Sequence, residues 1–466
     1  MLIGAGLRFH FLDSGLWYDE IVTLVESVRR PLASIVTQFP GSNDHLLYSV
    51  LGHLSITLFG EHAWSLRLPA ALFGVAALPL LYVFGANITS RFEALAATIL
   101  LTLSYHHLWF SQNARGYTIL FFCAVLATHL LIVGLRDNRR AVFVGYAVVS
   151  ALGAYTHLSM VWVVVGQACV VGGYLLARYR GRIQMRDWIN PVLGFVLAGV
   201  LTLILYSPLL LDIQASFVRE SEGPRVATAG WAIGEAFRGL QVGYATGGGI
   251  VLVGLLLTGA WSYLRRSPTV LALFIVPGAT LFAATLLLHR PMRPRLFFFL
   301  AGFALLIVVR GAVIIGDWLA RRIAPHIFGE RHRRLLPVAV VAGMTAVSML
   351  ALPAAYRYPK QDYEQALRYV EANAGANDLI VVAGAGATFP YQKYYGKPWK
   401  RLANAAELAT ARHGREAVWV IYTFKKYIEL LQPDLMKEIV AHCPPVKTFP
   451  GTTPDGSIVV TKCAGR

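Results

Sequence analysis

Residues 141–177 read "AVFVGYAVVSALGAYTHLSMVWVVVGQACVVGGYLLA" and contain no Asp, Glu, Lys or Arg. At about 1.5 Å per residue, one helix of this length would overshoot the roughly 30 Å of hydrocarbon in a bilayer. The stretch must therefore fold back on itself. It predicts two membrane-spanning helices with a turn between them near residues 157–159.

The composition of the whole chain agrees with this class. Hydrophobic residues make up 56% of 466 and charged residues only 14%, with a mean hydropathy of +0.55, whereas soluble domains average about 25% charged. The sequence thus predicts an all-α polytopic membrane protein with about 10–11 transmembrane helices. The apolar runs are 66–85, 94–110, 117–135, 141–160, 161–177, 189–211, 247–264, 269–288, 296–315 and 336–355.

The beginning of the chain departs from this pattern. Only Leu2–Leu12 is apolar there, and it contains Arg8. The segment is too short to span a bilayer and has neither the basic region nor the cleavage site of a signal peptide. Two interpretations stay open: a first helix truncated by a late start codon, or a short helix that tilts or thins the bilayer.

The basic residues predict the orientation. If the loop after the first helix faces out, every alternate connection carries Arg, as inside loops do. The net charge of +17 then reflects topology and attraction to anionic membrane lipids, so no nucleic-acid partner is predicted. The inside arginines are 91, 136, 139, 140, 178, 180, 182, 186, 265, 266, 310, 321, 322, 331, 333 and 334.

The outer side then collects the chain's other polar residues. Residues 12–27, "LDSGLWYDEIVTLVES", hold four acids in a protein with 25. An apolar stretch after Asp44 and His45 is typical of an amphipathic helix on the membrane surface. A third outer segment, 212–244, mixes charges with aromatic residues and is too polar to span. Residues 289–295, "HRPMRPR", place three arginines on the outer side. Because basic residues normally concentrate in inside loops, arginines at this position indicate an anionic ligand.

Several of these stretches occur in a familiar order. "LWYDEIVTL", "SQNARGYTILFFCAVLA", "YTHLSM" and "PRLFFFLAGFALL" resemble the C-type glycosyltransferases, in the family 39-like branch of protein O-mannosyltransferases and lipid A aminoarabinose transferases. The resemblance covers roughly residues 7–310. It implies a cell-membrane enzyme that moves a sugar, with inversion, from a polyprenyl-phosphate carrier to a hydroxyl of a lipid, glycan or protein acceptor on the outer face. Sugar and acceptor stay open.

The chemistry of such a transfer points to particular residues. An acceptor hydroxyl is a weak nucleophile and needs a general base, for which we predict Asp19, as the resemblance also does; Glu20 would bind acceptor or orient Asp19. The departing phosphate needs fixed cations, and Arg grips phosphate in two places. We predict Arg293 and Arg295 for this role, Arg295 being the better match. The alternatives are solvated acids at a helix start and arginines that anchor helix ends at lipid headgroups.

Further substrate-binding residues are predicted in the outer segments. Asn113 stands where members of the family commonly have an acid, and an amide cannot replace the charge of a carboxylate. Two alternatives stay open: the protein does without this acid, or Asp44 takes its role. Asp19, Glu20 and Asp44 offer oxygen ligands of the kind Mg²⁺ or Mn²⁺ prefers. Their spacing forms no ligand pattern, so no residue is assigned to a metal and a divalent cation as cofactor stays open. The full substrate-binding set is Asp44, His45, Asn113, Arg115, Tyr117, His157, Arg293 and Arg295.

From residue 356 the composition becomes that of a soluble domain. We predict a membrane domain over 1–355 and a small extracytoplasmic α/β domain over 356–466, with helices at 362–373 and 424–443 and strands at 379–383, 417–422 and 457–463. The glycine-rich "AGAGAT" lacks the Lys of a phosphate loop and reads as a strand-end turn. Cys443 and Cys463 fall in this domain, where an oxidising compartment permits a disulfide.

Two other classes of protein stay open. A transporter of lipid-linked sugars would place ionisable residues in broken helices near the middle of the bilayer, whereas these spans are poor in charge. A relative that binds lipid carriers without turnover is compatible with Asn113 in place of an acid. Release of free polyprenyl phosphate from a polyprenyl-phosphate sugar separates the enzyme from both.

Overall fold

The computed structural model describes residues 1–41, 44–179, 184–221, 229–322, 335–453 and 455–465. The chain divides into two compact units, which we call the membrane unit and the α/β unit. The membrane unit comprises Met1–His10, Val36–Gly52 and Arg67–Pro353. The α/β unit comprises Phe11–Ile35, His53–Leu66 and Ala354–Arg466, so two stretches of the N-terminal region group with the C-terminal domain.

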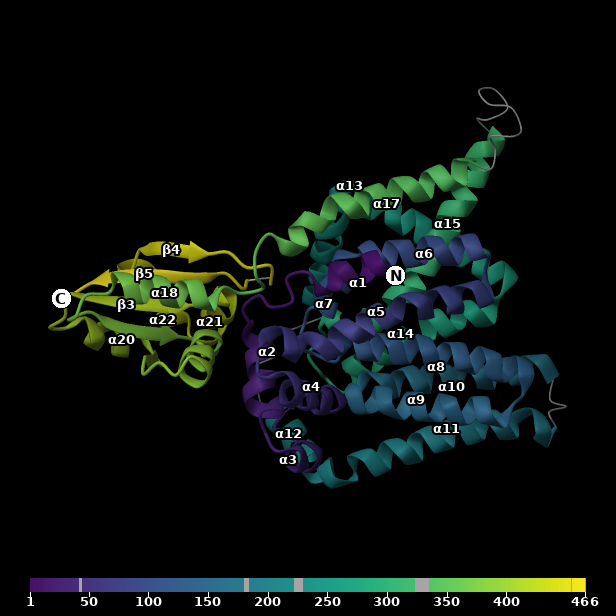
Figure 1. The fold of residues 1–466 in the computed structure, drawn as a ribbon, viewed down its shortest axis with the longest axis horizontal. Coiled ribbons are helices and arrows are strands. Elements are labelled where there is room, and N and C mark those ends of the chain that lie inside the picture. The colour runs from purple at the N-terminus through teal and green to yellow at the C-terminus, as the bar shows by residue number, and fades with distance from the viewer. Residues whose placement is uncertain (42–43, 180–183, 222–228, 323–334, 454, 466) are drawn as a thin grey trace. The chain divides into compact units, whose positions relative to one another are not determined.

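The membrane unit is helical throughout (Figure 1). Within the described residues, seven helical stretches are long and apolar enough to cross a membrane: Ala63–Ile88, Tyr117–Asp137, Ser159–Arg178, Asp187–Ser216, Pro268–Leu287, Pro294–Arg322 and Leu335–Tyr356. Leu46–Phe59 and Arg140–Thr156 are shorter apolar helices. The predicted multi-pass helical class is confirmed, and seven of the ten predicted runs coincide largely with these seven stretches. Of the other three runs, 94–110 is broken into two helices, 141–160 is mainly the shorter helix Arg140–Thr156, and 247–264 is part of a longer helix, Ala229–Arg266.

The following helices lie wholly or in part in this unit. Their bounds are α1 Leu2–Phe9, α4 Leu46–Phe59, α5 Ala63–Ile88, α6 Arg91–Leu103, α7 Tyr105–Ser111, α8 Tyr117–Asp137, α9 Arg140–Thr156, α10 Ser159–Tyr179, α11 Met185–Tyr206, α12 Leu210–Ser221, α13 Ala229–Arg266, α14 Pro268–Leu287, α15 Ala301–Arg322 and α17 Leu335–Tyr356, with a 3₁₀ segment η3, Pro294–Leu300, before α15. Of the predicted outer segment 212–244, the described residues are helical, in α12 and α13, and 222–228 lie outside the described part.

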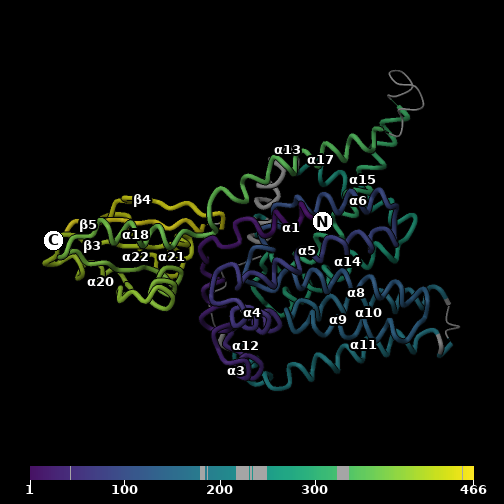
Figure 2. The backbone as a smooth tube through the Cα atoms, in the orientation of Figure 1, coloured from purple at the N-terminus to yellow at the C-terminus, as the bar shows by residue number. Residues whose placement is uncertain are grey.

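The predicted hairpin of residues 141–177 is present. Helices α9 and α10 meet at His157 and Leu158, and α8 packs on α9, which packs on α11 (Figure 2). Because each connection is short, successive helices run antiparallel. The start of α8, the end of α9 and the start of α10 therefore share one end of the bundle, which we call the polar-loop end.

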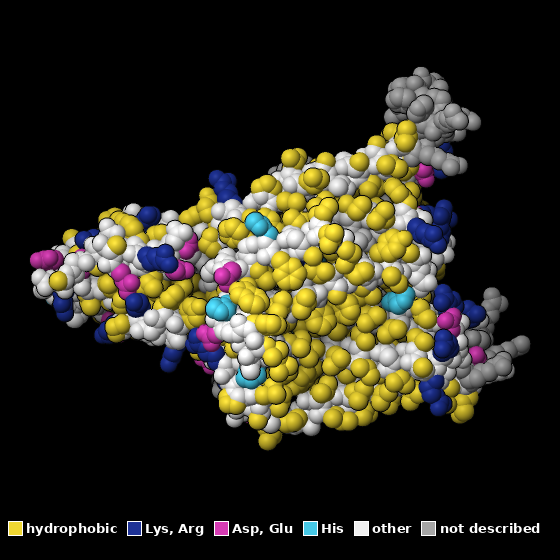
Figure 3. Space-filling model, viewed as in Figure 1, with side chains coloured by type: hydrophobic (Ala, Val, Ile, Leu, Met, Phe, Trp, Pro, Cys, Tyr) yellow, Lys and Arg dark blue, Asp and Glu magenta, His cyan; other side chains and the backbone are white. Residues whose placement is uncertain are grey.

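The opposite end of the bundle is basic. Arg136, Arg139 and Arg140 are exposed at the connection from α8 to α9, and on the face in Figure 3 Lys and Arg gather at helix ends while hydrophobic side chains cover the helices. Arg310 is an exception to the prediction, because it lies inside α15 rather than in a loop. Its Nη1 pairs with Glu93 Oε1 at 2.7 Å. Arg180, Arg182, Arg331, Arg333 and Arg334 lie outside the described residues.

The predicted span 94–110 is wrong, because the helix breaks at Ser104. Ser104 has an extended backbone (φ −66°, ψ 117°) and is the N-cap of α7. Its hydroxyl accepts a hydrogen bond from the backbone N–H of His107 in the first turn of that helix. The break frees backbone carbonyls at the end of α6. Buried Arg8 of α1 donates to two of them, Leu101 at 3.2 Å and Thr102 at 3.4 Å, and contacts His107 Nδ1 at 2.8 Å.

We therefore expect Arg8→Met to lower the free energy of unfolding by about 1–3 kcal/mol, because buried acceptors lose their donor. The measurement is thermal or denaturant unfolding of the purified protein in detergent. Arg91→Met, at an exposed position of α6, is the matched control. Equal unfolding midpoints for the two variants would contradict this role for Arg8.

The α/β unit contains a five-stranded sheet in the order β2-β1-β3-β5-β4. Strands β2 and β3 pair parallel to β1, and β5 pairs antiparallel to β3 and β4. The bounds of the strands are β1 Leu379–Ala383, β2 Lys400–Leu402, β3 Ala417–Tyr422, β4 Pro445–Phe449 and β5 Ile458–Ala464. The helices of the unit are α2 Tyr18–Thr23, α18 Tyr363–Asn373, α19 Ala385–Phe389, α20 Ala405–Arg412, α21 Lys425–Leu431 and α22 Pro433–His442; η1, Leu24–Val28, extends α2, and α3 is Leu32–Thr37.

The predicted strands β1 and β3 are confirmed residue for residue, and β5 is shifted by one residue. The predicted helix 424–443 is two helices, because Pro433 starts a new one. The glycine-rich segment makes the expected turn: Gly384 takes a positive φ of 73° before α19. Cys443 and Cys463 form a disulfide that ties the end of α22 to β5. The predicted domain boundary at 355/356 stays a prediction.

Candidate functional site

Four predicted residues meet at the polar-loop end of the membrane unit, and we call them the arginine–histidine cluster: His45, Arg115, Tyr117 and His157. Arg115 Nη2 lies 2.9 Å from His45 Nε2. The His45 ring lies 4.9 Å from both the Tyr117 and the His157 ring, and the Arg115 guanidinium lies 5.8 Å from the centre of the Tyr117 ring. Three separate connections thus supply one site.

Local structure explains why these segments approach so closely. Arg115 lies in the turn between α7 and α8, Tyr117 begins α8, and His157 ends α9. Gly116 makes the contact possible, because a Cβ at this position would lie 2.5 Å from Thr156 Cγ2 and 2.9 Å from His45 Nδ1. Any larger residue would force α9 or His45 away from the turn.

The two histidines are held in their neutral form. Burial, followed by the nearby positive charges of Arg115 and Arg295, lowers the pKa of His157 to about 3. Burial, Arg115, His157 and Arg295 hold the pKa of His45 well below its ordinary value. Arg115 can only donate, so His45 Nε2 accepts. The backbone N–H of Ser159 donates to His157 Nδ1 at 3.1 Å, which leaves the proton on Nε2.

Arg295 therefore belongs electrostatically to this cluster. It lies in η3, directly before the aromatic run that precedes α15, and it is partly buried. Arg293 caps η3 and is exposed, and Arg290 is partly buried before it. Two guanidinium groups beside neutral imidazoles and a phenol form a cationic site rich in hydrogen-bond donors, which suits a phosphate.

The neutral state of His157 predicts a pH dependence of stability. The unfolded chain takes up a proton at this histidine below about pH 6.5, and the folded chain does not until the pH approaches the lowered pKa of about 3. The contribution of His157 to the free energy of unfolding is therefore fully present above pH 6.5 and is lost as the pH falls toward 3. We expect the thermal midpoint to drop between pH 7 and pH 5.

The variant His157→Asn tests the cause, since Asn keeps a side-chain acceptor for the Ser159 N–H but does not titrate. We expect a smaller drop in the midpoint from pH 7 to pH 5 in this variant. An identical pH dependence in both proteins would show that His157 does not carry the effect.

The remaining predicted residues of the membrane unit lie near the same turns. Asn113 is fully buried in the turn before Arg115, and the Arg115 N–H donates to its carbonyl at 2.6 Å. Asp44 directly precedes His45, and its Oδ1 accepts a hydrogen bond from Ser49 at 2.6 Å. Ser49, which the sequence analysis did not single out, thus orients the acid next to the cluster.

The predicted acidic pair lies in the α/β unit, in α2. Glu20 is 0% and Asp19 8% exposed, so the alternative of two solvated acids is wrong. Glu20 Oε2 accepts from the Trp17 N–H at 3.3 Å, and its Oε1 lies 4.0 Å from Lys360 Nζ. Burial and then the charge of Asp19 raise the pKa of Tyr18 to about 12. The acidic pair is therefore a buried part of α2, with the ammonium group of Lys360 near Glu20.

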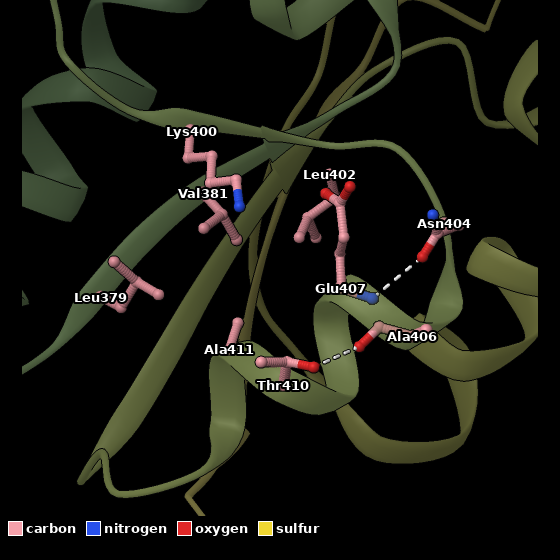
Figure 4. A pocket seen from close by; sticks show the side chains of 9 residues that line it. All are labelled: Leu379, Val381, Lys400, Leu402, Asn404, Ala406, Glu407, Thr410 and Ala411. Carbon is pink, nitrogen blue, oxygen red and sulfur yellow. Dashed lines mark hydrogen bonds between the residues drawn. The ribbon is translucent and has the colours of Figure 1, made fainter.

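The described residues also bear on two further kinds of site, a metal centre and a pocket. Among the described residues, no group of three or more His, Cys, Asp or Glu is arranged to hold a metal ion. A pocket of about 370 Å³ lies in the α/β unit between the β1–β2 edge and α20 (Figure 4), with Lys400, Asn404 and Glu407 on its rim and mainly apolar side chains inside. It is lined by none of the predicted site residues.

The fold places the chain in a class of protein: multi-pass membrane proteins with the C-type glycosyltransferase fold. Residues 46–211 match the family model "Dolichyl-phosphate-mannose-protein mannosyltransferase", so the match covers the first membrane helices and not the whole chain. A search of curated proteins gave no match.

Solved structures share the fold over nearly the whole chain. ArnT from Cupriavidus metallidurans bound to undecaprenyl phosphate is 15% identical, with a TM-score of 0.52, over 99% of this chain and 96% of that chain. The Archaeoglobus fulgidus oligosaccharyltransferase AglB, in complex with an inhibitory peptide and a dolichol-phosphate, is 10% identical, with a TM-score of 0.54, over 98% of this chain and 73% of that chain. These structures confirm the fold that the resemblance implied, and the family match over residues 46–211 agrees with it.

Proposed function

We propose that this protein transfers a sugar from a polyprenyl-phosphate carrier to an acceptor hydroxyl at the outer face of a cell membrane, with inversion at the anomeric carbon. The observation that carries the proposal is the arginine–histidine cluster with Arg295: a donor-rich, positively charged site made of residues that the family resemblance also points to. The undecaprenyl phosphate of ArnT and the dolichol-phosphate of AglB are ligands of the kind this site suits.

The steps of the reaction assign a role to each group. The acceptor oxygen attacks the anomeric carbon from the face opposite the phosphate, and the bond between that carbon and the phosphate oxygen breaks. Asp19 takes the proton of the attacking hydroxyl. The polyprenyl phosphate leaves with the bonding electron pair, and the guanidinium groups of Arg115 and Arg295 stabilise its growing negative charge.

The neutral histidines contribute hydrogen bonds without adding charge. His157 carries its proton on Nε2 and is a donor to a phosphate oxygen at any pH well above its lowered pKa of about 3. Tyr117 supports the Arg115 guanidinium through its ring face. The buried Asn113 replaces the charge of an acid by an amide, which keeps the site net positive. We propose that the α/β unit lies on the same, outer side.

The test is direct. The purified protein is incubated with a panel of undecaprenyl-phosphate sugars (hexose, pentose and aminosugar) and a membrane extract as acceptor source, and release of free undecaprenyl phosphate is followed by mass spectrometry. We expect release with one class of donor. A protein that binds undecaprenyl phosphate tightly but releases none from any donor is a lipid-carrier-binding relative, and movement of intact donor across vesicles without cleavage would make it a transporter.

A further inference from the structure

The acidic turn is held by the C-terminal part of the chain. Within the α/β unit, two consecutive residues before α18 reach α2: Lys360 Nζ lies 4.0 Å from Glu20 Oε1, and Gln361 Oε1 accepts from the Tyr18 N–H at 2.9 Å. Glu20 is 0%, Gln361 0% and Lys360 8% exposed. The residues on both sides of Asp19 are therefore held by buried side chains: Gln361 binds the backbone of Tyr18, and Lys360 lies near the carboxylate of Glu20.

Gln361 is itself fixed by the domain. Its Nε2 donates to Thr423 Oγ1 at 3.0 Å, at the end of β3. One side chain thus links the backbone of the acidic turn to the centre of the sheet. Because both polar groups of the amide are used and buried, the link has one geometry and a substituted side chain cannot reproduce it.

An aromatic contact completes this support. The Tyr18 ring lies 5.9 Å from the Phe424 ring and 6.4 Å from the Phe389 ring, both edge-on. Phe424 has a left-handed backbone (φ 55°), which its N–H stabilises by donating to the Asp455 carbonyl at 3.0 Å. Gly386 leaves room for it, since a Cβ there would lie 2.6 Å from Phe424 Cδ2. Phe424 thus keeps a strained backbone conformation at the position where its ring contacts Tyr18 of α2.

We propose that Lys360 and Gln361 are positioning residues of the transfer reaction, and that the C-terminal domain is a scaffold for the catalytic base. Lys360 balances the charge of Glu20, so that two adjacent acids coexist in a buried turn, and Gln361 fixes the backbone one residue before Asp19. The proposal rests on the proposed function, in which Asp19 is the base. A shift of about 1 Å in such a group costs on the order of 10²-fold in rate.

The experiment combines two readouts on the full-length protein in detergent. Hydrogen–deuterium exchange of residues 17–24 reports the order of α2 and needs no substrate. Release of undecaprenyl phosphate from the donor that supports turnover reports kcat and the donor KM. For Lys360→Met and for Gln361→Leu we expect faster exchange at residues 17–24, a kcat lowered by about tenfold to 10²-fold, and an unchanged donor KM.

Rescue and control variants separate positioning from loss of fold. Lys360→Arg keeps the charge and should restore kcat in large part. Lys397→Met, which removes another lysine of the same unit that pairs with Glu371 at 2.5 Å, should change neither readout. In a double-mutant cycle, Lys360→Met should cost little once Glu20→Gln has removed the charge that Lys360 balances.

The outcomes distinguish this proposal from the proposed function. Unchanged exchange at residues 17–24 in both Lys360→Met and Gln361→Leu overturns the positioning role, whatever the activity. Faster exchange together with an unchanged kcat also overturns it, and shows in addition that the reaction does not depend on the order of this turn. A raised donor KM at constant kcat assigns Lys360 to donor binding instead.

Discussion

Asp19→Asn is expected to lower kcat by about 10²–10⁴-fold, the usual contribution of a general base, while binding of undecaprenyl phosphate stays the same. The reason is that Asn keeps the size and hydrogen-bonding shape of the side chain but cannot take the proton of the attacking hydroxyl. Asp19 is 8% exposed, so water is a poor substitute for it. The measurements are initial rates of undecaprenyl phosphate release and, separately, equilibrium binding of undecaprenyl phosphate.

The control for this prediction is Glu26→Gln, which makes the same chemical change at an exposed residue of the same segment. It should leave the rate unchanged. Glu20→Gln should fall between the two, because Glu20 orients the turn without taking the proton. If Asp19→Asn turns over at the native rate with native expression, Asp19 has no part in the mechanism and another acid must be sought, first Asp44 beside the cluster.

Arg295→Ala is expected to lower kcat/KM for the donor by about 10²–10³-fold, the loss found when one fixed donor to a developing negative charge is removed. Arg295 is the arginine of residues 290–295 whose charge reaches both His45 and His157. Arg295→Lys should recover part of the loss, because a point charge remains but the planar fork is gone.

Arg290→Ala is the comparison that decides between a phosphate clamp and lipid anchoring. It lies in the same connection between α14 and η3 and is also partly buried. We expect its effect on kcat/KM to be within a few-fold, far below that of Arg295→Ala. Similar small effects for both variants would instead support arginines that hold two helix ends at the headgroups.

Much of the fold could be predicted from local pattern. Runs of apolar residues locate α8, α10, α11, α14 and α17, because burial in lipid requires about 20 such residues whatever surrounds them. The strands β1 and β3 are equally local, since both are short apolar runs between turn residues. The strands that were missed have no such signal: β2 is three residues long, and β4 starts at a proline and is mostly exposed.

The candidate site could be predicted only in part. The arginines, histidines and acids were found because they are rare in an apolar chain or match the family pattern. Ser49, Lys360, Gln361 and Thr423 were not, because a single hydroxyl, lysine or amide residue carries no signal in the sequence until its hydrogen-bond or ion-pair partner is known. The break at Ser104 was missed as well, since its stabilising donor, Arg8, lies far away along the chain.

The sequence by itself determined that this is a multi-pass membrane protein with a small α/β domain, because hydrophobicity and charge are properties of short stretches. It also marked the few polar residues that we propose for the chemistry. Only the tertiary structure decided that His45, Arg115, Tyr117 and His157 form one cluster, and that the acidic turn at residues 17–20 is bound by residues 360 and 361. Contacts across tens to hundreds of residues depend on how helices and strands pack, and that packing is settled by the whole chain at once.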